Sequence, residues 1–184
     1  IHAGAGGVGS IAIQLAKHLG ATVATTASAA NADLVRDLGA DTVIDYRSED
    51  FEEHLAGYDL VLDGVGAENV QKSMRVLRPG GKAIGIAGPP DPAFARQHGV
   101  NSLVKLVMFL LSYGIRKSAR KQSASYAFHF MTANGQQLSE ISKLIEAGSI
   151  KPVIDRVFAF EETKQALDYV EAGRTKGKVV IKVR

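Results

Sequence analysis

The chain has 184 residues, of which 46% are hydrophobic and 7% aromatic, and its formal net charge of +3 comes from 22 basic and 19 acidic residues. This length and composition predict one domain with a sizeable core, and the small charge imbalance argues against a nucleic-acid-binding protein. The absence of cysteine excludes disulfides and thiolate zinc sites and favours a cytoplasmic protein.

A glycine-rich turn opens the chain. Gly4, Gly6 and Gly9 stand at the G-x-G-x-x-G spacing, and residues 11–19 repeat apolar side chains at helical spacing. We expect Gly4 to allow the tight turn, Gly6 to admit a pyrophosphate and Gly9 to bring the helix close to the sheet. Phosphate would then meet the N–H groups of a helix N-terminus. Only residues 1–3 precede this turn, so we expect the first strand to begin upstream.

The end of the second strand, residues 21–26, selects between NAD and NADP in such folds. An acidic residue there binds the ribose 2′-hydroxyl and repels a 2′-phosphate, and this chain has no acid before Asp33. Ser28, Asn31 and the Tyr46-Arg47 pair could donate hydrogen bonds to a phosphate, so the sequence predicts NADPH. Ser28 could equally cap the following helix.

Strand and helix patterns alternate along the chain. Further strands are expected at residues 42–45, 58–63, 82–87 and 125–131, and helices at residues 31–38, 48–55, 68–77 and 135–148. Strands separated by helices run parallel and are covered on both faces, which predicts an α/β fold with a doubly wound, six-stranded parallel Rossmann sheet. Such sheets bind ligands at the carboxyl ends of their strands, so the glycine loop, residues 64–65 and residues 86–87 should converge on one crevice.

Residues 89–122 are less regular and contain the most apolar run of the chain. Residues 103–111 follow a capping Asn101 and predict a helix that packs on the sheet, a neighbouring domain or a second subunit. The run is far shorter than the ~20 residues of a membrane span, and no membrane partner is expected. The basic cluster after it, residues 116–121, is either a solvated helix face, which we favour, or a site for a polyanion.

The remaining residues, 151–184, differ in character. Short strands at residues 152–154 and 157–160, a helix at about 162–171 and a strand at 177–183 read as elements that pair with something beyond the sheet. We therefore expect a dinucleotide-binding domain over residues 1–150 and a C-terminal tail over residues 151–184.

Several ordered motifs resemble the medium-chain dehydrogenase/reductase superfamily, and more narrowly its zinc-independent quinone oxidoreductase branch. They are the Ala5-Gly6-Gly7-Val8-Gly9 run, Leu38-Gly39-Ala40-Asp41 with Val43-Ile44-Asp45-Tyr46, Asp63-Gly64-Val65-Gly66, Leu77-Arg78-Pro79-Gly80-Gly81 and Gly173-Arg174-Thr175-Lys176-Gly177-Lys178-Val179-Val180. The resemblance covers essentially the whole chain. It implies an N-terminal GroES-like catalytic domain, absent here, to which the tail would return.

The glycine motif and the resemblance together predict one cofactor site. Its residues are Gly4, Gly6, Gly7, Val8, Gly9, Ser28, Asn31, Tyr46, Gly64, Val65, Ile86, Ala87, Phe128 and Phe130. By resemblance, Val8 and residues 86–87 lie near the nicotinamide, and Ser28 and Tyr46 lie near the 2′-phosphate. Family members often have a lysine near the position of Asn31, so this chain departs from the pattern there.

Catalytic residues are not identified by the sequence. The five histidines show no metal-ligand spacing, no metal site is expected, and no Ser-His-acid arrangement stands out. The resemblance implies the cofactor half of an NADPH-dependent oxidoreductase that reduces quinones or α,β-unsaturated carbonyls, with substrate contacts from the missing domain, so this fragment alone should be inactive. The alternative is a non-catalytic NAD(P)-binding module with a redox-sensing or scaffold role.

The last strand of the predicted sheet, residues 125–131, would lie at its edge. Unpaired backbone groups there invite a second copy, so we expect a homodimer through Tyr126, Phe128 and Phe130, or through the apolar helix at residues 103–111. The competing interpretation is that these side chains fill the core or contact the missing domain.

Overall fold

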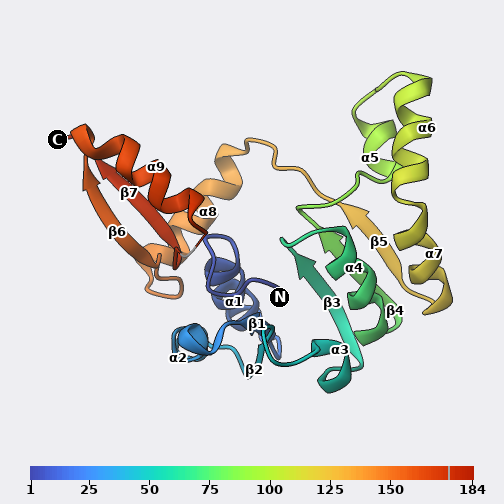
Figure 1. The fold of residues 1–184 in the computed structure, drawn as a ribbon, viewed down its shortest axis with the longest axis horizontal. Coiled ribbons are helices and arrows are strands. Elements are labelled where there is room, and N and C mark those ends of the chain that lie inside the picture. The colour runs from blue at the N-terminus through green and yellow to red at the C-terminus, as the bar shows by residue number, and fades with distance from the viewer. Residues whose placement is uncertain (174) are drawn as a thin grey trace. The chain divides into compact units, whose positions relative to one another are not determined.

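The computed structural model of the chain describes residues 1–173 and 175–184, which form two compact units. We describe each by itself, as the glycine-loop unit (residues 3–47 and 134–184) and the three-stranded unit (residues 1–2 and 48–133). Every ladder of paired strands is parallel, in sheets of order β1-β2, β3-β4-β5 and β6-β7 (Figure 1). The α/β class is thereby confirmed. The hydrogen-bonded ladders make three small sheets and do not establish the expected six-stranded one.

The glycine-loop unit contains two parallel strand pairs with helices around them. Its elements are α1 (Gly9–His18), β1 (Ala24–Ala27), the 3₁₀ turn η1 (Ala29–Asn31), α2 (Ala32–Asp37), β2 (Thr42–Asp45), α8 (Gly135–Glu146), β6 (Ile154–Ala159), the 3₁₀ turn η3 (Phe160–Glu162), α9 (Thr163–Glu171) and β7 (Lys178–Lys182). The apolar side chains of Ile13, Val35 and Ile44 are buried. The strands of the tail pair with each other, β6 beside β7, with α9 as the crossover.

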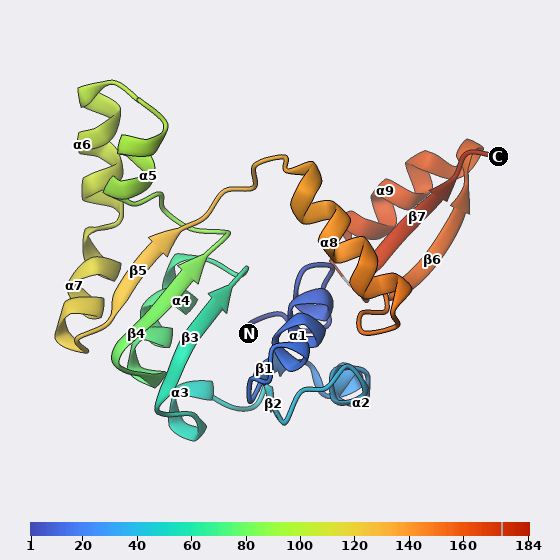
Figure 2. The same cartoon turned by 180° about the vertical axis from the view of Figure 1, so that it is seen from behind.

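The three-stranded unit is a parallel sheet with β4 between β3 and β5 (Figure 2). Its elements are α3 (Phe51–His54), β3 (Tyr58–Asp63), α4 (Ala67–Ser73), the 3₁₀ turn η2 (Met74–Val76), β4 (Leu77–Gly85), α5 (Pro92–Gln97), α6 (Ser102–Leu111), α7 (Tyr113–Lys121) and β5 (Ser125–Phe128). Its core includes the buried side chains of Val61, Val70, Met74 and Ala83.

Local signals in the sequence account for several element ends. The side chain of Asn101 accepts a hydrogen bond from Val104 N at 2.9 Å and begins α6, and Asn134 caps α8 in the same way. Gly20, with φ of +81°, ends α1 in the left-handed conformation that suits glycine.

Several strands differ from the sequence-based expectation. β1 covers Ala24–Ala27 instead of residues 21–26, and the single strand β6 replaces the two expected at residues 152–154 and 157–160. β4 ends at Gly85, so residues 86–87 lie beyond it. β4 begins at Leu77 instead of residue 82, because Gly80 adopts φ of +83° and bulges the strand while its N–H bonds Ser123 O at 2.7 Å. β5 ends at Phe128, so Phe130 lies beyond the strand and is 62% exposed. The longer strand that we expected over residues 125–131 is therefore wrong at its C-terminal end.

Candidate functional site

The glycine loop is the turn that leads into α1. Gly6 N donates to Ala3 O and Ser10 N donates to Gly6 O, each at 3.0 Å, which curls the loop before the helix begins. Among the described residues, no hydrogen bond uses the backbone N–H of Gly7, Val8 or Gly9. Three such donors at a helix N-terminus, with no acidic residue in the first turn, are the arrangement to which anions bind in proteins.

Steric contacts explain two glycines of the loop, Gly4 and Gly9. A Cβ on Gly4 would lie 2.1 Å from Thr25 Oγ1, and a Cβ on Gly9 would lie 2.3 Å from Ala3 O. A Cβ on Gly6 would be 3.2 Å from Ala3 O, a tight contact that small shifts could relieve. The positive φ of the turn, 53°, belongs to Ala3, so the expected turn role of Gly4 is wrong: this glycine makes room for β1.

A lysine from the tail lies against the loop. A Cβ on Gly7 would come within 2.6 Å of Lys178 Nζ, so the ammonium group occupies the space beside this glycine. Gly177 N donates to Ala5 O at 2.8 Å, which holds the start of β7 on the loop, and Lys178 N donates to Val153 O at 2.8 Å, just before β6. The salt bridges of the described residues do not include Lys178. Sequence reasoning missed this cation because 170 residues separate it from the loop.

The C-terminal ends of β1 and β2 lie side by side, and they lead into the residues predicted to bind the adenosine part of the cofactor. Ala27 pairs with Asp45, so Ser28 and Tyr46 follow neighbouring strands, and Tyr46 N donates to Ala27 O at 3.4 Å. Ser28 is buried and begins η1 without a side-chain capping bond, so its expected capping alternative is not found. The side-chain oxygen Oδ1 of Asn31 is buried without a hydrogen-bond partner, as expected of an atom that meets a ligand donor.

In the three-stranded unit, Asp63 shapes the loop after β3. Its fully buried carboxylate accepts hydrogen bonds from Val65 N at 3.1 Å and Gly66 N at 2.8 Å, and a further one from the side-chain amide of Asn69. These bonds hold the loop backbone against β3, and the Val65 side chain is 59% exposed. A Cβ on Gly64 would lie 3.5 Å from the Ile86 side chain, so the two predicted segments are neighbours.

Tyr126 supports the loop that follows β4. Its hydroxyl donates to Pro89 O at 2.9 Å. A Cβ on Gly85 would lie 3.0 Å from the hydroxyl oxygen of Tyr126. Burial, with the Asp91 and Asp63 carboxylates, raises the pKa of Tyr126 to about 12, so the hydroxyl remains a donor at neutral pH. Tyr126 thereby contacts the chain on both sides of residues 86–87. Its side chain is 8% exposed and so fills the core, which is the competing interpretation of this residue.

The aromatic residues predicted near the carboxamide differ from each other. Phe128 is half-buried and its ring meets Phe94 edge-on at 5.1 Å between centroids, as expected of a core side chain. Phe130 is exposed beyond β5. Only Phe128 thus lies on the strand that borders the loop after β4.

No catalytic group emerges from the histidines. His2 is buried, hydrogen-bonded to Ser73 Oγ at 2.9 Å and packed edge-on against Phe51. Burial lowers the pKa of His2 to about 3, so its imidazole is neutral in the folded protein at neutral pH. Within residues 1–173 and 175–184, no group of three or more His, Cys, Asp or Glu side chains could hold a metal ion, and no helix is long and apolar enough to cross a membrane.

The comparisons with known proteins agree with this geometry. Residues 38–181 match the family model described as zinc-binding dehydrogenase. The chain is 34% identical to the mitochondrial NAD(P)H oxidoreductase RTN4IP1 of Danio rerio over 98% of this chain and 47% of that protein. It is 36% identical to the chloroplastic NADPH-dependent alkenal/one oxidoreductase of Arabidopsis thaliana over 97% of this chain and 38% of that protein.

A solved structure supports the same assignment. The quinone oxidoreductase of Coxiella burnetii matches with a TM-score of 0.81 and 30% identity, over 100% of this chain and 51% of that one. The chain therefore spans about half, or less, of the length of the relatives that it matches. It belongs to the zinc-binding dehydrogenase family of the medium-chain dehydrogenase/reductase superfamily, in its zinc-independent, quinone oxidoreductase-like branch.

Proposed function

We propose that this chain is the cofactor-binding part of an NADPH-dependent oxidoreductase that reduces quinones or α,β-unsaturated carbonyls. The observation that carries the proposal is the glycine loop, where three backbone N–H groups make no hydrogen bond among the described residues and the Lys178 ammonium lies against Gly7. A dianionic pyrophosphate suits this combination of a helix N-terminus and a cation. The relatives named NAD(P)H and NADPH-dependent oxidoreductases support the cofactor.

The residues at the ends of β1 and β2 support NADPH over NADH. The segment directly after β1 has no acidic residue before Asp33 to repel a 2′-phosphate, and Ser28 and Tyr46 offer hydroxyl donors. The carboxylate of Asp45, the last residue of β2, accepts a hydrogen bond from Arg47 N at 3.1 Å. The unpartnered Oδ1 of Asn31 is an acceptor for a ribose hydroxyl or an adenine amine. We further propose residues 64–65 and 86–87 as cofactor contacts, with residues 1–150 as the dinucleotide-binding domain and residues 151–184 as its tail.

Bound NADPH supplies a hydride, and a quinone that takes up this hydride and one proton becomes a hydroquinone. The chain's own contribution is to bind and orient: the glycine loop holds the phosphates, while Asp63 and Tyr126 shape the two loops proposed to flank the nicotinamide. The groups that hold substrate are assigned to the part of the protein outside residues 1–184. The fragment alone should therefore bind NADPH without turnover. We further propose that the protein is a homodimer. We also propose a cytoplasmic location; the Danio rerio relative is named mitochondrial.

The experiment that tests the function measures NADPH oxidation with 1,4-benzoquinone and with but-3-en-2-one. It uses the full-length protein and the fragment of residues 1–184, with NADPH binding followed by calorimetry. We expect both to bind and only the full-length protein to turn over. Binding by both without any turnover would favour the alternative, a non-catalytic NAD(P)-binding module. No NADPH binding by the full-length protein would contradict both functions.

A further inference from the structure

Helices α6 and α7 combine exposed apolar and basic side chains in a segment without acidic residues. Residues 101–124 contain five basic residues and no Asp or Glu. The five are Lys105, Arg116, Lys117, Arg120 and Lys121. The cofactor site of this protein uses none of them.

The apolar part of this surface is α6. Each of its ten residues except Met108, which is half-buried, is exposed to solvent. Figures 1 and 2 show the helix beside α5, on the far side of β5 from β3. Its exposed large apolar side chains are Leu103, Val104, Leu106, Val107, Phe109, Leu110 and Leu111. Because a helix that is apolar on all sides is normally buried, this one requires a non-aqueous partner.

The basic part is the outer face of α7. Ile115 and Ala119, one turn apart, are buried where α7 packs against α4 and β5. Lys117, Arg120 and Lys121 are exposed, and Lys117 and Lys121 lie one turn apart on the side away from the packed face. The salt bridges of the described residues include none of the five basic side chains of residues 101–124.

Arg116 joins the two parts into one surface. Its guanidinium donates to Phe109 O at 2.7 Å and to Ser112 Oγ at 3.2 Å. The same group lies 4.1 Å from the centre of the Phe109 ring. These contacts fix the end of α6 to the start of α7, so the apolar helix and the basic face are presented together.

We propose that α6 and α7 form a docking surface for an anionic lipid membrane. The apolar side chains of α6 enter the boundary between headgroups and acyl chains, and the cations of α7 contact the negative headgroups. Ten residues are too few for α6 to span a bilayer, so the helix lies in the interface plane. A second copy is a poorer partner, because a two-fold contact through this face would set five cations against five others without a carboxylate between them.

The test is vesicle co-sedimentation with the full-length protein. Vesicles of phosphatidylcholine alone are compared with vesicles that contain roughly 30% phosphatidylserine, at about 0.1 M and about 0.5 M salt. We expect about tenfold stronger binding to the anionic vesicles at the lower salt and loss of this preference at the higher salt. Equal binding to both vesicle types, or no binding to either, would overturn the proposal.

Matched variants separate the two parts of the surface. Leu106→Gln/Leu110→Gln should weaken binding to anionic vesicles about tenfold, because both side chains leave the lipid boundary. Lys117→Gln/Arg120→Gln/Lys121→Gln should remove the preference for anionic vesicles. The control Leu138→Gln/Ile145→Gln changes two exposed apolar residues of α8 and should bind as the unaltered protein does.

Two results with these variants would overturn the proposal. One is an equal loss of binding in the α8 control, which would show nonspecific adsorption. The other is conversion of a dimer to a monomer by Leu106→Gln/Leu110→Gln, with unchanged vesicle binding, which would assign α6 to a second copy. Circular dichroism and NADPH binding confirm that each variant is folded. The three substitutions on α7 replace exposed side chains only, so they test the charged part even if the leucine variant is unstable.

Discussion

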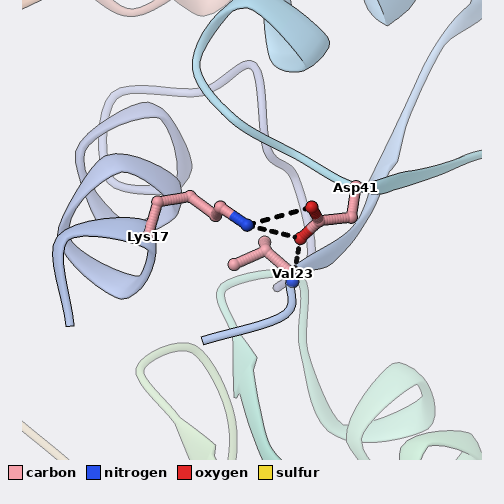
Figure 3. A network of polar contacts seen from close by, with 3 residues as sticks. All are labelled: Lys17, Val23 and Asp41. Carbon is pink, nitrogen blue, oxygen red and sulfur yellow. Dashed lines mark hydrogen bonds and ion pairs between the residues drawn. The ribbon is translucent and has the colours of Figure 1, made fainter. Parts of the chain in front are cut away.

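The carboxylate of Asp41 accepts two hydrogen bonds from Lys17 Nζ, at 2.9 and 2.8 Å, and its Oδ2 also accepts one from Val23 N at 2.7 Å (Figure 3). The contact links the last turn of α1 to the segments that enter β1 and β2. The hydrogen bond from Lys17 is the largest cause that lowers the pKa of Asp41, followed by the backbone bond from Val23. This pair therefore fastens the helix behind the glycine loop to its own strands.

Asp41→Asn should lower the melting temperature at pH 7. A carboxylate whose folded-state pKa lies below its unfolded value contributes stability above the unfolded pKa of about 3.9, and this contribution is lost as the pH falls through the folded pKa. Thermal melts from pH 7 down to about pH 3 should therefore show the difference between protein and variant shrinking at the acidic end. Asp33→Asn, which removes an exposed carboxylate paired with Arg36 on α2, is the control and should change the melting temperature less.

Gly6→Val should abolish cofactor binding and leave the protein folded. The branched side chain would fill the space where the phosphates approach, while its Cβ meets only Ala3 O at 3.2 Å. We expect the dissociation constant for NADPH, measured by fluorescence titration, to rise by more than about 100-fold. Gly9→Val is the contrasting variant, because its Cβ would clash with Ala3 O and destabilise the loop itself. Retained NADPH binding by Gly6→Val would place the phosphates elsewhere.

Ser28→Asp should shift the preference from NADPH toward NADH. The unaltered protein should bind NADPH more tightly because no carboxylate follows β1, and the new aspartate would repel a 2′-phosphate and accept from a ribose hydroxyl. Calorimetric dissociation constants for both nucleotides give the ratio, and Ser142→Asp on α8 controls for the added charge. Equal or reversed affinities in the unaltered protein would contradict the NADPH assignment.

Lys178→Gln should weaken NADPH and NADH to the same extent. If Lys178 serves the pyrophosphate that both nucleotides share, its loss should cost roughly tenfold in affinity, or about 1.4 kcal/mol, with a weaker salt dependence. Lys182→Gln, at the other end of β7, should have no such effect. A loss confined to NADPH would instead place Lys178 at the 2′-phosphate.

The homodimer is expected to use the free edge of β5, which pairs with β4 on one side and with no other strand of the described residues. Light scattering of the full-length protein should give a dimer, because an unpaired edge leaves backbone groups for a second copy. Phe130→Asp, at an exposed position two residues after the end of β5, should weaken the dimer. A substitution at the half-buried Phe128 would also disturb the contact between Phe128 and Phe94. A monomer at high micromolar concentration would rule out this dimer.

Much of the local structure follows from the sequence. The bounds of β2 and β3, the caps of α6 and α8 and the glycine loop before α1 agree with their patterns because each depends on neighbours within a few residues. The sequence also shows directly that no acidic residue lies between the end of β1 and Asp33. The longer strand expected over residues 125–131 was wrong, and the core alternative describes the Tyr126 side chain, because aromatic side chains suit a core, a strand end and an interface equally well.

By itself, the sequence determined the α/β class, the parallel strands and the position of the glycine-rich turn before α1, since periodicity and glycine spacing act over one or two turns of chain. Only the tertiary structure decided what stands around that turn. Lys178 reaches Gly7 because β7 begins on the glycine loop, and Tyr126 reaches Pro89 because β5 pairs with β4. Contacts of this kind join residues far apart in the chain through packing and burial, which no local pattern of residue types encodes.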